Sequence, residues 1–360
     1  MDMSFELFGR TIVVAGFLPA LLWLVLNVAF FWQPTHPFEE RLLALLNLQA
    51  LVLITSVAAA LGVLLYAFNN VIIHWYEGAY AFQRRWLLGW AQRRNERRNE
   101  RLYHSLVDLR RMHQEALTSL DVKDGRDGGD MSRRLDSALL AIDQAHHQFE
   151  QEQALRQLPV NRKLVMPTAL GNAYAVMEEY PYERYGMDSM VFWPRLIAVL
   201  PAEYRQSIGD QKTTCDFLLN TSLVLVLFAA QAAATLVLVA LGVIALQSAW
   251  LGRALLLALP LALAGAYGFY RAAVSETHIL GKLIATAFDL YRHTLLGHFG
   301  IEPPARLSDE RLTWRRLAAF IRRGDAFYHP AEVSTPMPDE APARQPSSPA
   351  ATSSRTRLEH

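Results

Sequence analysis

Four long apolar stretches constrain this chain more than any other feature of its sequence. They cover residues 11–32, 42–68, 217–246 and 254–270. A helix of about 20 residues crosses the roughly 30 Å hydrocarbon core of a bilayer, and each stretch lies near or above that length. The sequence therefore predicts an all-α membrane protein with four transmembrane helices.

The spans are expected to pair into two hairpins, because only the short turns 33–41 and 247–253 separate the members of each pair. Pro34 and Pro37 in the first turn break helices. A signal peptide begins with a basic segment, whereas residues 1–10 carry one basic and two acidic side chains. We therefore interpret the first stretch as a retained span.

Basic residues predict the orientation of these hairpins. Residues 84–111 contain nine arginines and residues 275–330 contain eight lysines and arginines, whereas each short turn holds one arginine. Positively charged segments resist translocation. We expect both termini and the middle region to face the cytoplasm, in a multi-pass protein of a bacterial inner membrane.

The predicted spans divide the chain into five parts. These are a first hairpin (1–68), a helical cytoplasmic region (69–216), a second hairpin (217–271), C-terminal cytoplasmic helices (272–328) and a tail (329–360). The tail is rich in Pro, Ala, Ser and Thr and should be disordered; its last three residues resemble the remnant of a purification tag.

Two helices should form most of the middle region. Residues 69–120 contain no proline, which predicts that the second span continues through them as one helical stalk. A glycine- and aspartate-rich break at 121–130 then favours an antiparallel return over 131–158, ended by Pro159.

An aromatic block follows, with four prolines and six Tyr, Phe or Trp residues within 163–201. We expect a helix over 168–179, stopped at Pro181, and then a compact irregular unit over 180–201. Large aromatic side chains near arginines favour an internally packed knot, and an exposed docking surface is the alternative. The docking or packing candidates are Tyr182, Arg184, Tyr185, Asp188, Trp193 and Arg195.

None of the four spans contains an ionisable residue at depth, which argues against a pump or a secondary transporter. Amides and small residues stand out in and near the spans instead. They either join helices by hydrogen bonding and close packing or line a pore. The pore or helix-packing candidates are Asn27, Asn47, Gln49, Asn220, Gln231, Ala264 and Gly268.

Several functional classes lack their residues in this sequence. The 35 Lys and Arg balance 34 Asp and Glu, so bulk charge does not favour nucleic acid as a partner. One cysteine and no HExxH pattern leave no predicted metal site, cofactor or catalytic residue. Glu178, Glu179 and Asp188 are the only plausible acids for an enzyme acting on lipid.

Three segments resemble a family of uncharacterised bacterial four-span inner-membrane proteins. They are PTALGNAYAVMEEYPYERYGMDSMVFWPRL (167–196), AFDLYRHTLLGHFG (287–300) and ERLTW (310–314). The juxtamembrane YPYERYGMDSMVFWPRL element is the most distinctive part. The resemblance implies the four-span topology and an inner-membrane location, and it implies no activity.

These observations favour a non-enzymatic membrane protein that self-associates in the lipid bilayer as a homo-oligomer. Its cytoplasmic region would receive a protein or small-molecule signal and control a gated pore or a membrane-disrupting effector. The alternative is a membrane scaffold that recruits a cytoplasmic partner without conduction. A lipid-acting membrane enzyme is the third interpretation.

Overall fold

The computed structural model describes residues 11–31, 47–83, 88–101, 158–243 and 249–324, with the single positions 104, 108, 111 and 140. In these ranges every regular element is a helix, which confirms the all-α class. The helices are η1 (Ile12–Phe17), α2 (Leu18–Phe31), α4 (Leu48–Ala67), α5 (Asn69–Glu77), η3 (Arg162–Leu164), α8 (Ala169–Tyr185), α9 (Ser189–Val199), α10 (Ala202–Ala240), α11 (Ala249–His298) and α12 (Leu307–Arg323). Another helix covers residues 89–101.

Four helical segments are long and apolar enough to cross a membrane, as the sequence predicted. They are Ile12–Phe31, α4, α10 and α11. α10 has 39 residues and α11 has 50. At 1.5 Å per residue they extend roughly 60 and 75 Å, about twice the thickness of a hydrocarbon core or more. Only part of each helix therefore fits within a bilayer.

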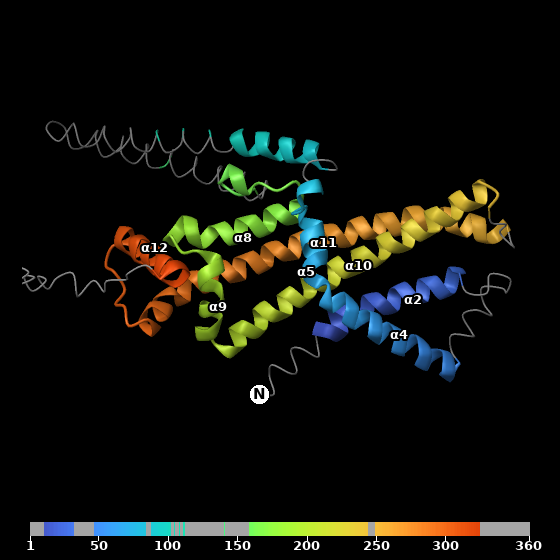
Figure 1. Ribbon diagram of the computed structural model, residues 1–360, viewed down its shortest axis with the longest axis horizontal. Coiled ribbons are helices and arrows are strands. Elements are labelled where there is room, and N and C mark those ends of the chain that lie inside the picture. Colours follow the sequence, from blue (N-terminus) through green and yellow to red (C-terminus); the bar gives the residue numbers. More distant parts are fainter. Residues whose placement is uncertain are drawn as a thin grey trace, which may run out of the picture.

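α10 and α11 lie side by side along their length and run antiparallel (Figure 1). Polar contacts recur at successive levels between them. Tyr204 donates to the Leu283 carbonyl at 2.8 Å, Gln211 to Glu276 at 2.6 Å, and Ser222 to the Ala266 carbonyl at 2.9 Å. These contacts fix the register of the two helices.

The first two spans meet through a glycine contact that the sequence analysis did not identify. Gly62 of α4 packs so closely on η1 that an added Cβ atom would lie 2.7 Å from the Phe17 amide nitrogen and 3.0 Å from the Gly16 carbonyl carbon. The predicted close-packing pair, Ala264 and Gly268, instead lies on an exposed face of α11, and an added Cβ at Gly268 would meet nothing within 4 Å.

The prediction of one continuous stalk over 69–120 is wrong. α5 ends at Gly78, whose φ of +72° is the left-handed conformation that terminates helices. Helical residues resume at 81–83, and a further helix covers residues 89–101. An added Cβ at Gly78 would lie 2.6 Å from the Pro167 ring, so glycine also allows the α8 entry loop to approach. The predicted return over 131–158 and the tail lie almost wholly outside the described residues.

Helices α8 and α9 pack on the part of α11 farthest from its turn to α10, and α12 packs on α8 and α9 (Figure 1). The first part of α10 contributes Ile208 and Cys215 to the same core. We call this assembly the helical body. Its core is a cluster of large apolar side chains, of which the most deeply buried include Phe192, Leu196, Phe288, Leu296, Trp314 and Leu317. Phe192 and Trp314 meet edge to face, with ring centroids 4.9 Å apart.

The predicted irregular unit over 180–201 is also wrong. α8 continues past Pro181 to Tyr185, and α9 forms a second helix after Gly186, whose φ is +71°. Proline removes one helical hydrogen bond, and the contacts that α8 makes beyond Pro181 hold the helix together. Met187, Val191 and Leu196 are buried in the core of the helical body, so α9 packs there.

Candidate functional site

A polar cluster joins three helices of the body at the end of α11 farthest from the α10–α11 turn. Asp289 of α11 accepts hydrogen bonds from two tyrosines of α8. The Tyr180 hydroxyl lies 3.0 and 2.9 Å from its two carboxylate oxygens, and the Tyr185 hydroxyl lies 2.7 Å from one of them. One carboxylate thus fixes both sides of Pro181 against α11.

Arg292 extends this cluster from α8 to α12. Its guanidinium lies 4.3 Å from the centroid of the Tyr185 ring, and its Nε donates to Glu310 at 2.9 Å. The indole nitrogen of Trp314 donates to the same oxygen of Glu310 at 3.3 Å. The Glu310 side chain is 5% exposed and that of Arg292 is 19% exposed, so this is a largely buried ion pair.

Burial and, next to it, the hydrogen bond to the Asp289 carboxylate raise the pKa of Tyr185 from its ordinary 10.0 to about 12. Burial and Asp289 also raise the pKa of Tyr180. A neutral hydroxyl donates to the carboxylate, whereas a phenolate would repel it.

The folded protein should therefore lose stability as the pH becomes strongly alkaline. A hydroxyl whose pKa is higher in the folded than in the unfolded state contributes stability to the fold. That contribution is fully present below the unfolded-state pKa and is lost as the pH rises through the folded-state pKa. We expect the melting temperature to fall between pH 10 and about 12. Tyr185→Phe should lower stability at pH 8 and show a smaller alkaline fall. Equal slopes in both proteins would contradict this assignment.

A groove of about 610 Å³ lies beside this cluster, between α8, α11 and the loop 158–160. Most of its lining is apolar, and the polar side chains at its edges include Arg184 and Lys282. Glu179 holds the loop in place, since its two carboxylate oxygens accept from the Val160 and Asn161 amides at 2.8 Å each. The groove thus lies beside residues 158–160, part of the segment that leads into α8.

Three aromatic-block candidates lie on the surface or at helix ends. Tyr182 is 53% exposed, and Arg315 of α12 lies over its ring at 5.8 Å. Arg184 is exposed and lies 5.9 Å from the Tyr180 ring centroid. Asp188 caps α9 by accepting from the Val191 amide at 3.3 Å, and it also pairs with Arg322.

The remaining candidates divide between the cluster and the core. Tyr185 belongs to the Asp289 cluster. Trp193 is half-buried, with its ring centroid 6.0 Å from that of Phe288. Arg195 donates to the Val191 carbonyl of its own helix at 2.6 Å and forms no ion pair in the described part of the chain. Nothing in the local sequence marks Asp289, Arg292 and Glu310 as site residues, because charged residues on helices carry no local signal of burial.

The Trp193→Ala variant distinguishes internal packing of Trp193 from a role in a docking surface. Removing a half-buried tryptophan should destabilise the body by about 2 kcal/mol, roughly half the loss at a fully buried site. Met190→Ala is the matched control on the same helix, because Met190 is 73% exposed. Thermal unfolding of both variants measures the difference, and a Trp193→Ala melt equal to that of Met190→Ala would favour the docking surface.

Most of the polar candidates in and near the spans form hydrogen bonds within their own helix. Asn27 donates to the Trp23 carbonyl of its own helix at 2.8 Å. Asn47 is the N-cap of α4 and accepts from the Gln49 amide at 3.2 Å, so both residues lie at the end of that span and not at depth. Gln231 is half-buried on α10.

Among these candidates, Asn220 alone forms a hydrogen bond between two of the apolar helices in the described part of the chain. It is fully buried and donates to the Ala15 carbonyl at 2.7 Å. Ala15 lies in the π-helical segment η1. Asn220 therefore attaches the first span to α10.

The acids proposed for a lipid-acting enzyme have separate structural contacts. Glu179 binds the 160–161 amides, whereas Asp188 caps α9 and pairs with Arg322. Glu178 is exposed on α8. In the part of the chain that the structure describes, no three or more His, Cys, Asp or Glu side chains are grouped to hold a metal ion.

Comparison with known proteins assigns no family or function to this arrangement of residues. No family model, no curated protein and no solved structure shows significant similarity to this chain.

Proposed function

We propose that this chain is a non-enzymatic, self-associating protein of a bacterial inner membrane. Its helical body faces the cytoplasm, receives a protein or small-molecule signal in the groove between α8 and α11, and transmits its state to the membrane. Two transmembrane hairpins anchor it, because short turns separate the members of each pair of apolar stretches, and the distribution of basic residues favours the cytoplasmic side for the body.

The continuity of α10 and α11 carries this proposal. Each helix begins or ends in the helical body and continues without interruption into the apolar stretch. Packed helices move as rigid elements with discrete arrangements. The groove borders α11 at Gly281 and Lys282, so a molecule that separates α8 from α11 would shift a helix that also crosses the bilayer.

Exposed surface on the spans supports self-association. Only 11% of the apolar window of α4 is buried within one chain. Ala264 and Gly268 form a small-residue face on α11 that lies open to the surroundings. Small residues allow helices of different chains to approach closely in lipid.

A scaffold without conduction is the second candidate, and one observation favours it. The exposed side chains of α4 are largely apolar, and its exposed hydroxyls, those of Thr55 and Ser56, donate to carbonyls of their own helix. A water-filled pore needs polar groups that face its lumen. Planar-bilayer recording separates the candidates, because a pore conducts and a scaffold does not.

A wedge in the groove tests the transmission itself. Gly281→Trp should push α8 away, since an added Cβ there already lies 3.6 Å from Met177. Gly297→Trp on the same helix is the control, because its Cβ would meet nothing within 4 Å. The reporter is a cysteine at Ala232 of α10, which is fully buried against α11 and α2. Cys215, the only native cysteine, is replaced by alanine.

We expect Gly281→Trp to raise maleimide labelling at position 232 severalfold over the Gly297→Trp control. A second reporter at Ala58, a buried residue of α4, distinguishes transmission from unfolding, which would expose both sites. Equal labelling of position 232 in both variants would contradict transmission through α11.

The mass of the detergent-solubilised protein tests self-association. Gly268→Leu should shift an oligomer toward the monomer, whereas Gly297→Leu should leave the mass unchanged. A monomeric mass for the parent protein would contradict both the proposed self-association and the proposed pore.

A further inference from the structure

α5 crosses α10 and α11 at the level where their apolar stretches end on the side of the helical body (Figure 1). The Tyr76 ring stacks on the Tyr270 ring with centroids 5.8 Å apart, and the Tyr76 hydroxyl donates to Ser222 at 3.0 Å. Tyr270 is the last residue of the apolar stretch 254–270, and Ser222 lies near the start of the stretch 217–246. When α10 and α11 cross a bilayer, α5 therefore lies at its surface.

The side of α5 that faces away from the other helices is apolar. Phe68, Val71 and Trp75 follow one another at helical spacing and are 54%, 50% and 50% exposed. Trp75 also packs against the exposed Phe82, with ring centroids 5.7 Å apart. A helix with such a face at a membrane boundary lies in the interface with its apolar side among the lipids, a level that tryptophan favours. We call Phe68, Val71 and Trp75 the apolar stripe.

The helix over 89–101 begins beside the end of α5, and its amide side chains fix its orientation. Three of them donate to backbone carbonyls of the segment that leads into α8: Gln92 to Val165 at 2.8 Å, Asn95 to Met166 at 2.9 Å, and Asn99 to Pro159. The same segment reaches α5, where the Thr168 hydroxyl donates to the Glu77 carbonyl at 2.8 Å. One side of the helix is thus fixed against the protein.

The other side of this helix carries an arginine face, made of the exposed residues Arg93, Arg94, Arg97 and Arg98. Their guanidinium groups form no ion pair and no hydrogen bond in the described part of the chain. The acidic residues of the helix have other partners, since Glu96 accepts from Gln92 at 2.9 Å and Glu100 pairs with Arg162 at 3.2 Å. The arginine face is therefore open to anionic groups from outside the chain.

The four arginines can act together on one charged surface. Arg93 and Arg98 are separated by roughly 8 Å along the helix axis. The Debye length at physiological ionic strength is about the same. A negatively charged surface beside Arg93 therefore also attracts Arg98.

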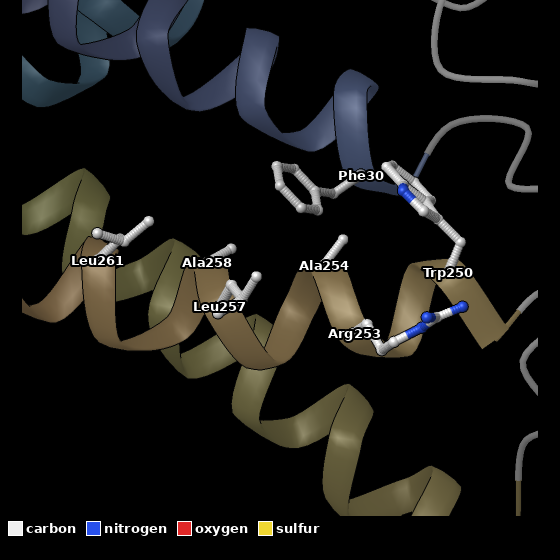
Figure 2. Close-up of a pocket in the computed structure, with 7 residues that line it drawn as sticks. All are labelled: Phe30, Trp250, Arg253, Ala254, Leu257, Ala258 and Leu261. Carbon is white, nitrogen blue, oxygen red and sulfur yellow. The ribbon is translucent and has the colours of Figure 1, made fainter.

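The opposite end of α10 and α11 carries no comparable charge. Arg253 is the only charged residue within 217–270. Figure 2 shows it at the start of α11, where its labelled neighbours, among them Phe30, Trp250 and Leu257, are apolar. Along these two helices, charge is concentrated at the end that carries α5, so the arginine face lies beside the leaflet next to the helical body.

We propose that α5 and the arginine face together bind the surface of an anionic phospholipid leaflet. The apolar stripe lies among the lipids, and the arginine face contacts their phosphates. Each guanidinium carries five N–H donors, which suit phosphate oxygens, and an anionic leaflet attracts basic segments next to a span. A nucleic acid would match the charge but would leave the apolar stripe without a partner. The proposal rests on the membrane location proposed above, and it is independent of the signal, of self-association and of conduction.

Quenching of Trp90 fluorescence by nitroxide-labelled lipids tests the proposal, because Trp90 is 62% exposed at the start of the arginine helix. The full chain is reconstituted in vesicles of phosphatidylcholine and phosphatidylglycerol, with the nitroxide near the headgroup end of the acyl chains of one lipid at a time. The Trp90 signal is the difference between the parent and Trp90→Phe proteins. We expect phosphatidylglycerol to be preferred at Trp90. The double variant Arg93→Gln with Arg94→Gln should reduce that preference at least about fivefold, the worth of one basic residue near a membrane surface.

Matched controls exclude general effects of charge and of misfolding. The double variant Arg315→Gln with Arg316→Gln removes the same charge from exposed positions of α12, in the helical body, and should keep the preference. Trp75, measured in the same way with Trp75→Phe, should still be quenched in the Arg93 and Arg94 double variant, because the apolar stripe keeps α5 at the surface.

Two results would overturn the proposal. Equal quenching of Trp90 by both lipids, unchanged in the Arg93 and Arg94 double variant, would mean that only the general lipid annulus lies nearby. Absence of quenching at Trp90 by either lipid would place the arginine face away from the membrane, and binding of a single-stranded oligonucleotide that the double variant loses would then assign this face to nucleic acid. Neither result depends on the mass of the assembly or on conductance, so both differ from a failure of the proposed function.

Discussion

Replacing Glu310 by alanine is expected to destabilise the folded protein by about 3–5 kcal/mol, because the change leaves a buried guanidinium without its carboxylate. Arg292 loses its 2.9 Å contact and Trp314 loses the acceptor of its indole N–H. The packing of α12 on α11 should loosen, because Arg292 and Glu310 join these two helices. The measurement is the unfolding free energy of the detergent-solubilised protein.

Glu100→Ala is the control for this prediction. Glu100 pairs with Arg162 at 3.2 Å, but their side chains are 47% and 60% exposed, and exposed pairs contribute only about 0–1 kcal/mol. The double variant Arg292→Met with Glu310→Leu should recover part of the loss, because apolar residues of similar size can replace a buried pair. A Glu310→Ala loss no larger than that of Glu100→Ala would refute the buried-pair assignment.

Gly62→Ala should give the second large effect, a loss of about 1–3 kcal/mol or more through overpacking between the first two spans. The added Cβ would lie 2.7 to 3.0 Å from backbone atoms of Gly16 and Phe17, which cannot rotate away. η1 and α4 must therefore move apart along their crossing.

Gly297→Ala is the matched control on α11, where the added methyl group meets nothing within 4 Å. The melting temperature of the solubilised protein should fall in Gly62→Ala and should not fall in Gly297→Ala. An equal melting temperature for the two variants would refute the close contact between η1 and α4.

Local patterns in the sequence were enough to predict the four apolar helices and the all-α class. Hydrophobicity sums over neighbouring residues, and a run of about 20 apolar side chains needs no tertiary partner to specify a helix in lipid. The candidate site residues of the aromatic block were also visible as large side chains at unusual density. Which of them pack and which stay exposed was not visible, as the different positions of Tyr182 and Tyr185 show.

Tertiary contacts decided where helices break and where they continue. Gly78 ends α5 without any proline, because a left-handed residue terminates the helix and lets Pro167 approach. Pro181 does not end α8, because Tyr180 and Tyr185 on either side of it both bind Asp289, more than one hundred residues later in the chain.

The same distance along the chain explains what the sequence could not indicate about packing. Gly16 and Gly62 resemble the other glycines in the spans until two helices cross at them, whereas the small-residue pattern at Ala264 and Gly268 marks a face that one chain leaves open. Arg292 and Glu310 resemble ordinary surface charges until α12 folds back on α11 and buries them. Apolar length is a property of a segment, but a close contact or a buried ion pair belongs to two segments, and only the tertiary structure brings them together.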